Sequence, residues 1–172
     1  AGTIISGTGG SKKATPSNAE TVTGEAYYNQ SGPLDVCLPE KMDRKEGYTI
    51  SDRRDALEVI PLEGDYSRSS ASGNMARYSS VFPGVDIQYT VLGSTVKEDI
   101  ILLDRQDRNA FSYQLKSDTL KFRKDGETLL AYRDTWHRPK FALTAPVMVD
   151  AEGNTSTAIL LAYRSSDKTI TY

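Results

Sequence analysis

The chain has 172 residues, of which 21 are Lys or Arg and 23 are Asp or Glu, so its formal net charge is -2. This near balance argues against a nucleic-acid-binding protein, because neutralising phosphates needs a concentrated basic face. Hydrophobic residues make up 38% of the chain, which excludes a wholly disordered protein. The longest apolar stretch, residues 158–163, is far shorter than the roughly 20 residues that span a bilayer, so we expect no membrane insertion.

The first 32 residues have the composition of a linker. Gly, Ser, Thr, Asn and Pro are frequent in them, and large apolar side chains are few. We therefore predict that residues 1–32 are a flexible linker or an edge segment, in which only residues 3–5 and 25–28 pair with a sheet. Residues 33–172 are predicted to form a single β-sandwich domain.

The rest of the chain is divided into short runs rich in β-forming residues, each ended by Gly, Asp, Asn, Ser or Pro. Tyr, with 10 residues against 4 Phe and 1 Trp, suits strand surfaces that are half buried and leave the hydroxyl wet. The fold class predicted is all-β, an antiparallel β-sandwich or a curled meander sheet built from consecutive hairpins. Strands are expected near residues 34–38, 47–51, 56–61, 75–79, 84–92, 95–103, 110–116, 119–124, 127–133, 145–149, 157–164 and 168–172.

Two turn signals set expected registers. A two-residue loop at Gly93 and Ser94 places Tyr89 opposite Glu98, with two apolar pairs on the same face. The Asp-Gly pair at residues 125–126 has the composition of a type I′ turn, and a loop of these two residues places Phe122 opposite Leu129.

Glu98 is unusual on this register, because it shares a face with Ile, Val, Leu and Tyr side chains. A lone carboxyl in apolar surroundings has a raised pKa and can act as a general acid, which motivates a glycoside hydrolase as one alternative. The other interpretation is that Glu98 accepts a hydrogen bond from Tyr89, pairs with an Arg, or turns outward at a bulge. No second carboxyl is singled out, and we predict no catalytic residue.

Trp136, His137 and Arg138 are the candidate ligand-binding residues. An exposed Trp beside His and Arg can stack on a sugar ring and bond its hydroxyls, which motivates a carbohydrate-binding alternative directed at cell-wall glycan. The other interpretation is that Trp136 packs over a sheet edge. One His and one Cys, Cys37, supply too few ligands for a transition-metal site, so we expect no metal and no cofactor, and Cys37 is read as packed in the core.

Several phrases of the chain together resemble one family. Residues 78–89 read YSSVFPGVDIQY and residues 96–102 read VKEDIIL, and these follow IPLEGD at residues 60–65. Residues 33–39 read PLDVCLP and residues 146–153 read PVMVDAEG. This set resembles the N-terminal β module of bacterial wall-associated, RHS-repeat (tyrosine–aspartate, or YD, repeat) proteins, over about residues 33–172.

The resemblance implies a non-catalytic structural or adhesion module of a very large Gram-positive protein, secreted or attached to the cell wall, near DNRLRE-type domains. Some such proteins are toxins whose killing activity lies in a distant C-terminal domain. The implied partners are other domains of the same polypeptide, with cell-wall glycan as an alternative and no nucleic acid. The resemblance marks Asp86, Tyr89, Lys97 and Glu98 as motif positions without assigned chemistry, and we expect Lys97 and Asp86 to form an exposed cross-strand charge network.

Overall fold

The computed structural model describes residues 2–7, 19–21, 26–29, 32–133 and 138–172. Within these residues the protein has 18 strands and no helix, and every strand pairing is antiparallel. The predicted all-β antiparallel class is therefore confirmed. No helix long and apolar enough to cross a membrane occurs among these residues.

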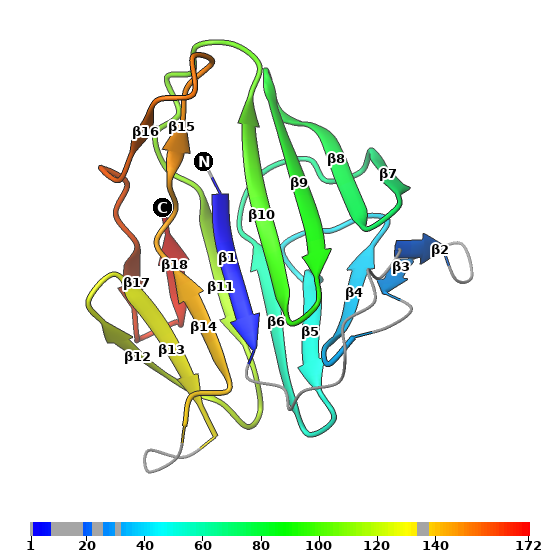
Figure 1. Ribbon diagram of the computed structural model, residues 1–172, viewed down its shortest axis with the longest axis vertical. Coiled ribbons are helices and arrows are strands. Elements are labelled where there is room, and N and C mark those ends of the chain that lie inside the picture. The colour runs from blue at the N-terminus through cyan, green and yellow to red at the C-terminus, as the bar shows by residue number, and fades with distance from the viewer. Residues whose placement is uncertain (1, 8–18, 22–25, 30–31, 134–137) are drawn as a thin grey trace.

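The first sheet, sheet A, faces the viewer in Figure 1. It has 8 strands in the order β12-β13-β14-β1-β10-β9-β8-β7, so the first strand of the chain lies between strands from two later stretches, residues 69–102 and 121–144. Their bounds are β1 Gly2–Gly7, β7 Ser69–Ser72, β8 Met75–Phe82, β9 Val85–Leu92, β10 Thr95–Leu102, β12 Lys121–Asp125, β13 Thr128–Tyr132 and β14 Phe141–Thr144.

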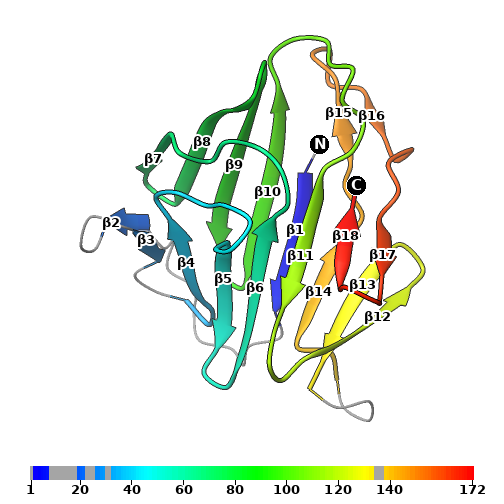
Figure 2. The ribbon, with the colours of Figure 1, turned by 180° about the vertical axis from the view of Figure 1, so that it is seen from behind.

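The second sheet, sheet B, faces the viewer in Figure 2, with 8 strands in the order β17-β18-β11-β6-β5-β4-β3-β2. A separate two-stranded hairpin, β15–β16, projects at one end of the molecule. The bounds are β2 Ala19–Thr21, β3 Ala26–Asn29, β4 Asp35–Pro39, β5 Tyr48–Asp52, β6 Asp55–Pro61, β11 Ser112–Lys116, β15 Met148–Val149, β16 Thr155–Ser156, β17 Ala162–Arg164 and β18 Thr169–Thr171.

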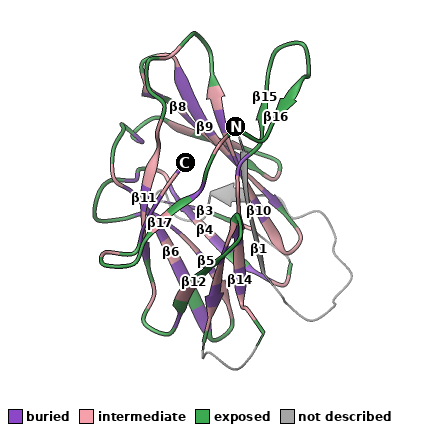
Figure 3. Cartoon of the chain, turned by 90° about the vertical axis from the view of Figure 1, so that its left-hand side faces the viewer, coloured by how far each residue is buried: buried purple, intermediate pink, exposed green. Residues whose placement is uncertain are grey.

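The two sheets pack face to face, and Figure 3 marks the buried residues on the strands of both layers; their side chains form one hydrophobic core. Tyrosine rings form much of this core. The rings of Tyr48 on sheet B and Tyr89 on sheet A have centroids 4.6 Å apart, and Tyr78 packs edge-on against Tyr89 and Tyr66. Many tyrosines are thus wholly buried, hydroxyl included, whereas the composition suggested half-buried rings with wet hydroxyls.

The β9–β10 hairpin has the predicted register. Val91 faces Val96, Tyr89 faces Glu98 and Ile87 faces Ile100, which confirms the shared face. The loop consists of Gly93 and Ser94, and Gly93 adopts a φ of 58°, in the left-handed region that glycine enters without strain.

The β12–β13 hairpin has a different register from the one predicted. Phe122 faces Ala131 and not Leu129, because the loop consists of residues 126–127 and Asp125 still pairs with Thr128. Gly126 has a φ of 57° and occupies the first loop position, as Gly93 does in the other hairpin. The type I′ pattern has glycine in the second loop position, so the loop was predicted at residues 125–126. The observed loop lies one residue later, which moves the partner of Phe122 from Leu129 to Ala131.

The N-terminal segment takes a more central place than its composition indicates. Residues 2–7 form β1, which pairs with β10 on one side and with β14 on the other. Residues 3–5 therefore pair with a sheet as predicted, but β1 is neither a linker nor an edge strand. Backbone hydrogen bonding needs no particular side chain, so composition alone did not reveal this position.

Consecutive strands also change sheets more often than a meander would. β10 belongs to sheet A and β11 to sheet B, and β12 returns to sheet A. The turn at residues 117–118 therefore connects the two layers, where consecutive hairpins were expected. Cys37 differs as well, because it lies on β4 in a half-buried position where a core position was expected.

Candidate functional site

The only buried glutamate among the described residues is Glu98, at the centre of β10. Its side chain points between the sheets, and the residue is 3% exposed. Tyr89 lies opposite it on β9, and Tyr113 approaches from β11 on the other sheet. Strand alternation places Glu98 inward, because Val96 and Ile100 on either side face the core too.

Burial raises the pKa of Glu98 to about 7, since the charged form loses its hydration. The hydroxyls of Tyr89 and Tyr113 lie close enough to moderate this rise in pKa. Neither hydroxyl, however, makes a well-formed hydrogen bond to a described residue. The carboxyl is thus surrounded by neutral phenols and has no ion pair with a described residue, and its pKa lies near neutral pH.

The same environment keeps the tyrosines neutral. Burial, followed by the nearby Glu98 carboxylate, raises the pKa of Tyr89 and of Tyr113 well above the ordinary value. Phenols held neutral can only donate or accept hydrogen bonds, so they cannot serve as bases. Because Glu98 is enclosed by the core, a substrate has no route to it, and the general-acid interpretation is not supported.

Asp86 is the second buried carboxyl of this hairpin, and it has charged and backbone partners. Arg77 donates from Nη2 to Oδ2 at 2.5 Å and from Nε at 2.9 Å, while the Ser80 amide donates to Oδ1 at 2.7 Å. Burial raises the pKa of Asp86, but the Ser80 and Arg77 hydrogen bonds outweigh it and the pKa is lowered overall. Ser80 has a φ of 53°, and the Asp86 carboxylate holds that left-handed conformation in place.

The expected charge network between Lys97 and Asp86 does not form. Lys97 pairs with Asp99 at 2.9 Å, and Asp86 pairs with Arg77. The prediction was that Asp86 lies on the polar face of the hairpin, yet it is 5% exposed, and the Arg77 guanidinium and the Ser80 amide contact its carboxylate. The signal that was missed is Arg77, which lies on the neighbouring strand β8.

A third charged cluster closes one end of the sandwich. The Asp55 side chain is fully buried at the start of β6, where Thr119 donates to its Oδ1 at 3.0 Å and Arg133 Nε lies 3.3 Å away. Lys140 Nζ lies 3.8 Å from Asp55 Oδ2 and 3.9 Å from Asp52 Oδ2. The cluster ties sheet B to the β13–β14 connection of sheet A, and no sequence pattern groups these residues.

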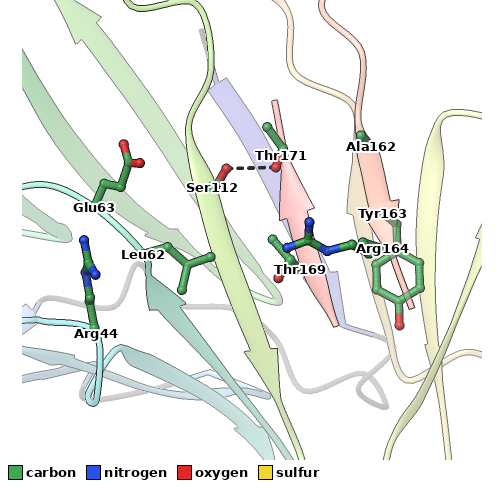
Figure 4. Close-up of a pocket in the computed structure, with 9 residues that line it drawn as sticks. All are labelled: Arg44, Leu62, Glu63, Ser112, Ala162, Tyr163, Arg164, Thr169 and Thr171. Atoms are coloured by element: carbon green, nitrogen blue, oxygen red, sulfur yellow. Dashed lines mark hydrogen bonds between the residues drawn. The ribbon is translucent and has the colours of Figure 1, made fainter. Parts of the chain in front are cut away.

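A shallow groove of about 570 Å³ lies on the outer face of sheet B (Figure 4). Arg44 and Glu63 lie on one side and Tyr163 and Arg164 on the other, across strands β11 and β18. A second hollow of about 430 Å³ shares two of these residues. The first groove is lined by Arg44, Leu62, Glu63, Ser112, Ala162, Tyr163, Arg164, Thr169 and Thr171.

The charges of this groove largely compensate one another. Arg108 Nη1 lies 2.6 Å from Glu63 Oε2 at its rim, and Arg164 Nη2 lies 2.6 Å from Asp167 Oδ2. The groove therefore offers hydroxyls, one half-buried ring, paired charges and the single guanidinium of Arg44, which do not make a concentrated basic face. None of the sequence-based candidates lines it.

The structure describes only one of the three predicted ligand-binding residues. Trp136 and His137 lie outside the described residues, and Arg138 is exposed before β14. Their role stays a prediction. Across the described part of the chain, no three His, Cys, Asp or Glu side chains gather as metal ligands would.

Comparison with known proteins gives one consistent set of relatives. These are the tRNA nuclease WapA of Bacillus subtilis strain 168, the tRNA(Glu)-specific nuclease WapA of Bacillus subtilis subsp. natto and the tRNA3(Ser)-specific nuclease WapA of Bacillus spizizenii. Each is 26% identical over 117 residues, which cover 66% of this chain and 5% of the relative. No protein-family model matches the chain, and no solved structure matches it.

These relatives overturn three expectations. The non-catalytic structural or adhesion module and the expected absence of enzyme activity are contradicted, because the relatives are named as tRNA-specific nucleases. The expected absence of a nucleic-acid partner is contradicted for the same reason. Their names also give no support to the glycan-binding or glycosidase alternatives. The net charge describes these 172 residues alone, and the 117 of them that match cover only 5% of each relative.

The resemblance to wall-associated proteins stands in its broader form. The similarity to WapA agrees with the resemblance to bacterial wall-associated, RHS-repeat proteins and with the expected association with the cell wall. At 26% identity across 66% of its own length, this β-sandwich chain is similar to the tRNA nuclease WapA.

Proposed function

We propose that this chain is a domain of a larger wall-associated protein that cleaves tRNA. The observation that carries the proposal is the 117-residue similarity, at 26% identity, to three proteins that are each named as tRNA nucleases. The chain spans about 5% of the length of those relatives. The tRNA nuclease activity is accordingly assigned to the whole polypeptide.

The proposal also places the domain within that polypeptide. The phrases at residues 78–89, 96–102 and 146–153 resemble the N-terminal part of RHS-repeat proteins, near DNRLRE-type domains. We assign the chain to that position in an exported Gram-positive protein. Residues 33–172 are the segment that carries these phrases.

Local chemistry is a weaker support than the comparison. The described carboxyls with unusual surroundings are enclosed or ion-paired, as Glu98 and Asp86 are. Arg164 in the groove and Arg108 at its rim are each paired with a carboxylate, and Arg44 is the one lining arginine without an ion pair to a described residue. No described surface therefore identifies where RNA is held, and the proposal concerns the activity of the parent protein.

The test is a cleavage assay on the parent protein. Full-length protein, a variant that lacks all 172 residues of this chain, and the isolated 172-residue chain are each incubated with total tRNA. Products are separated on denaturing gels, and their new ends are sequenced. We expect the full-length protein to cut tRNA into discrete fragments and to leave a DNA duplex of equal length intact.

The three samples of the cleavage assay test different statements. Failure of the full-length protein to cut any tRNA, in a reaction where a known ribonuclease does, overturns the proposal. Cleavage by the isolated chain assigns the chemistry to these residues. A fall in cleavage for the deletion variant alone shows that the domain supports an activity placed elsewhere in the polypeptide.

A further inference from the structure

Strand β1 holds the two halves of sheet A together. Its backbone pairs antiparallel with β10 from Gly2 opposite Asp99 to Ser6 opposite Thr95. On its other side it pairs with β14 from Ile5 opposite Leu143 to Gly7 opposite Phe141. Figure 1 shows β1, in blue, between these two strands at the centre of the sheet.

Without β1 the sheet has a gap. In the order β12-β13-β14-β1-β10-β9-β8-β7, no described pairing joins β14 directly to β10. Removing β1 leaves two facing strand edges with unpaired amide and carbonyl groups. Such edges bind an extended segment readily, because every residue added restores backbone hydrogen bonds.

The segment that fills this gap is remote in sequence from both neighbours. β1 ends at Gly7, whereas β10 begins at Thr95 and β14 at Phe141. Residues 8–18, which follow β1, read TGGSKKATPSN and contain no large apolar side chain. An identical strand from a second copy presents the same backbone groups, so exchange of this strand between copies costs little in contacts.

We propose that the slot between β10 and β14 is a strand-binding site that accepts β1 of a second copy of this chain as well as its own. Recognition is by main-chain hydrogen bonds, with the incoming strand antiparallel to both neighbours and in the register of Ile5 opposite Val96 and Leu143. The partner is thus an extended segment with the sequence of residues 2–7. This inference is independent of tRNA cleavage.

The test uses the full chain with a protease recognition sequence inserted between Gly10 and Ser11. After cleavage, a fluorescent peptide of residues 1–10 is added in excess, and its incorporation is followed by size-exclusion chromatography. We expect about one peptide per chain to enter as the original fragment leaves. A matched peptide with Ile4→Pro, which lacks a ladder amide and clashes with the sheet, should incorporate at least about tenfold less.

Three results overturn the proposal. The first is no incorporation of the wild-type peptide, and the second is equal incorporation of the Ile4→Pro peptide. The third is an unchanged melting temperature after the fragment has been removed, since β1 then closes no gap. If cleavage unfolds the chain, the peptide is added during refolding, where recovery of the near-ultraviolet circular dichroism supports the proposal and no recovery contradicts it.

Discussion

Asp86 and Glu98 lie on the two strands of one hairpin, 5% and 3% exposed, and their surroundings differ in kind. The Asp86 carboxylate accepts hydrogen bonds from the Arg77 guanidinium and the Ser80 backbone amide, and its pKa is lowered. Glu98 meets phenol hydroxyls, and its pKa rises to about 7. Burial opposes the charge at both positions, so the partner decides the protonation state.

This difference separates two uses of a buried carboxyl. The Asp86 carboxylate is a fixed negative charge that fastens β8 to β9 and holds the backbone at Ser80. The Glu98 carboxyl is a polar group in a tyrosine-lined core, and its charge costs stability. The two residues should therefore respond oppositely to pH and to neutral substitution.

The largest expected effect is the pH dependence due to Glu98. Its folded pKa of about 7 exceeds the ordinary 4.5, so the folded state binds more protons between these values. The stabilisation from the protonated form is complete below pH 4.5 and is lost as pH rises through 7, by roughly 3 kcal/mol at about 1.4 kcal/mol per pKa unit. Glu98→Gln should flatten this slope in urea unfolding between pH 4.5 and 8.

The groups that face Glu98 support this assignment. Tyr48, Tyr89 and Tyr113 have pKa values well above 10 and do not titrate in the window. Asp99, the next residue on the strand, is paired with Lys97. An Asp99→Asn variant serves as the control and should keep the slope. Equal slopes for wild type and Glu98→Gln would contradict the interior assignment.

Loss of the Asp86 carboxylate should cost about 2 kcal/mol. Asp86→Ala removes the Arg77 pair and leaves the Ser80 amide without its acceptor, while Arg77 is exposed enough to regain water. Asp86→Asn keeps one acceptor oxygen and should lose about half as much. Urea unfolding at pH 7 measures both. A cost below about 0.5 kcal/mol for Asp86→Ala would remove the contrast with Glu98.

Tyrosine hydroxyls should divide into two classes. Tyr78 donates to the Pro39 carbonyl, so Tyr78→Phe should cost about 1 kcal/mol. The Tyr89 hydroxyl has no well-formed bond to a described residue, so Tyr89→Phe should change the unfolding free energy by less than that and raise the pKa of Glu98 further. The pH dependence of the unfolding free energy, measured for each variant, tests the expected rise in the pKa of Glu98. A larger loss for Tyr89→Phe than for Tyr78→Phe would reverse this ranking.

The smallest expected effect concerns Lys97. Its pair with Asp99 is largely solvent-exposed, so Lys97→Ala should cost below about 1 kcal/mol. In a double-mutant cycle, the coupling between Lys97→Ala and Asp86→Ala should be below about 0.3 kcal/mol, because the two residues share no partner. Coupling near 1 kcal/mol would restore the cross-strand network that the sequence suggested.

Much of the β9–β10 hairpin could be predicted from local sequence. Gly93 indicated the position of the loop, and the alternation of side chains indicated which of them face the core. A two-residue loop there pairs Tyr89 with Glu98, as observed. Local sequence carries no information on which strand of the other sheet covers that face. Tyr113, from β11, is a neighbour of Glu98 that only the packing of two sheets reveals.

The predictions failed where pairing depends on residues far apart in sequence. β1 was placed at an edge because its composition is that of a linker, yet its backbone satisfies two neighbours. Asp86 was predicted to lie on a solvated face, because the alternation of side chains along one strand gives no information about Arg77 on the neighbouring strand. The function was misjudged for a related reason, since 172 residues carry little sign of what the rest of a long protein does.

The central position of β1 bears on the order in which the chain is made. Residues 2–7 are synthesised before both neighbours, and at roughly 5–20 residues per second the last of them, β14, follows on the order of ten seconds later. Until then the halves of sheet A cannot join, and pairing at such sequence distance is slow by nature. Among the strands of sheet A, β1 is made first, and its two neighbours are both present only once β14 has been made.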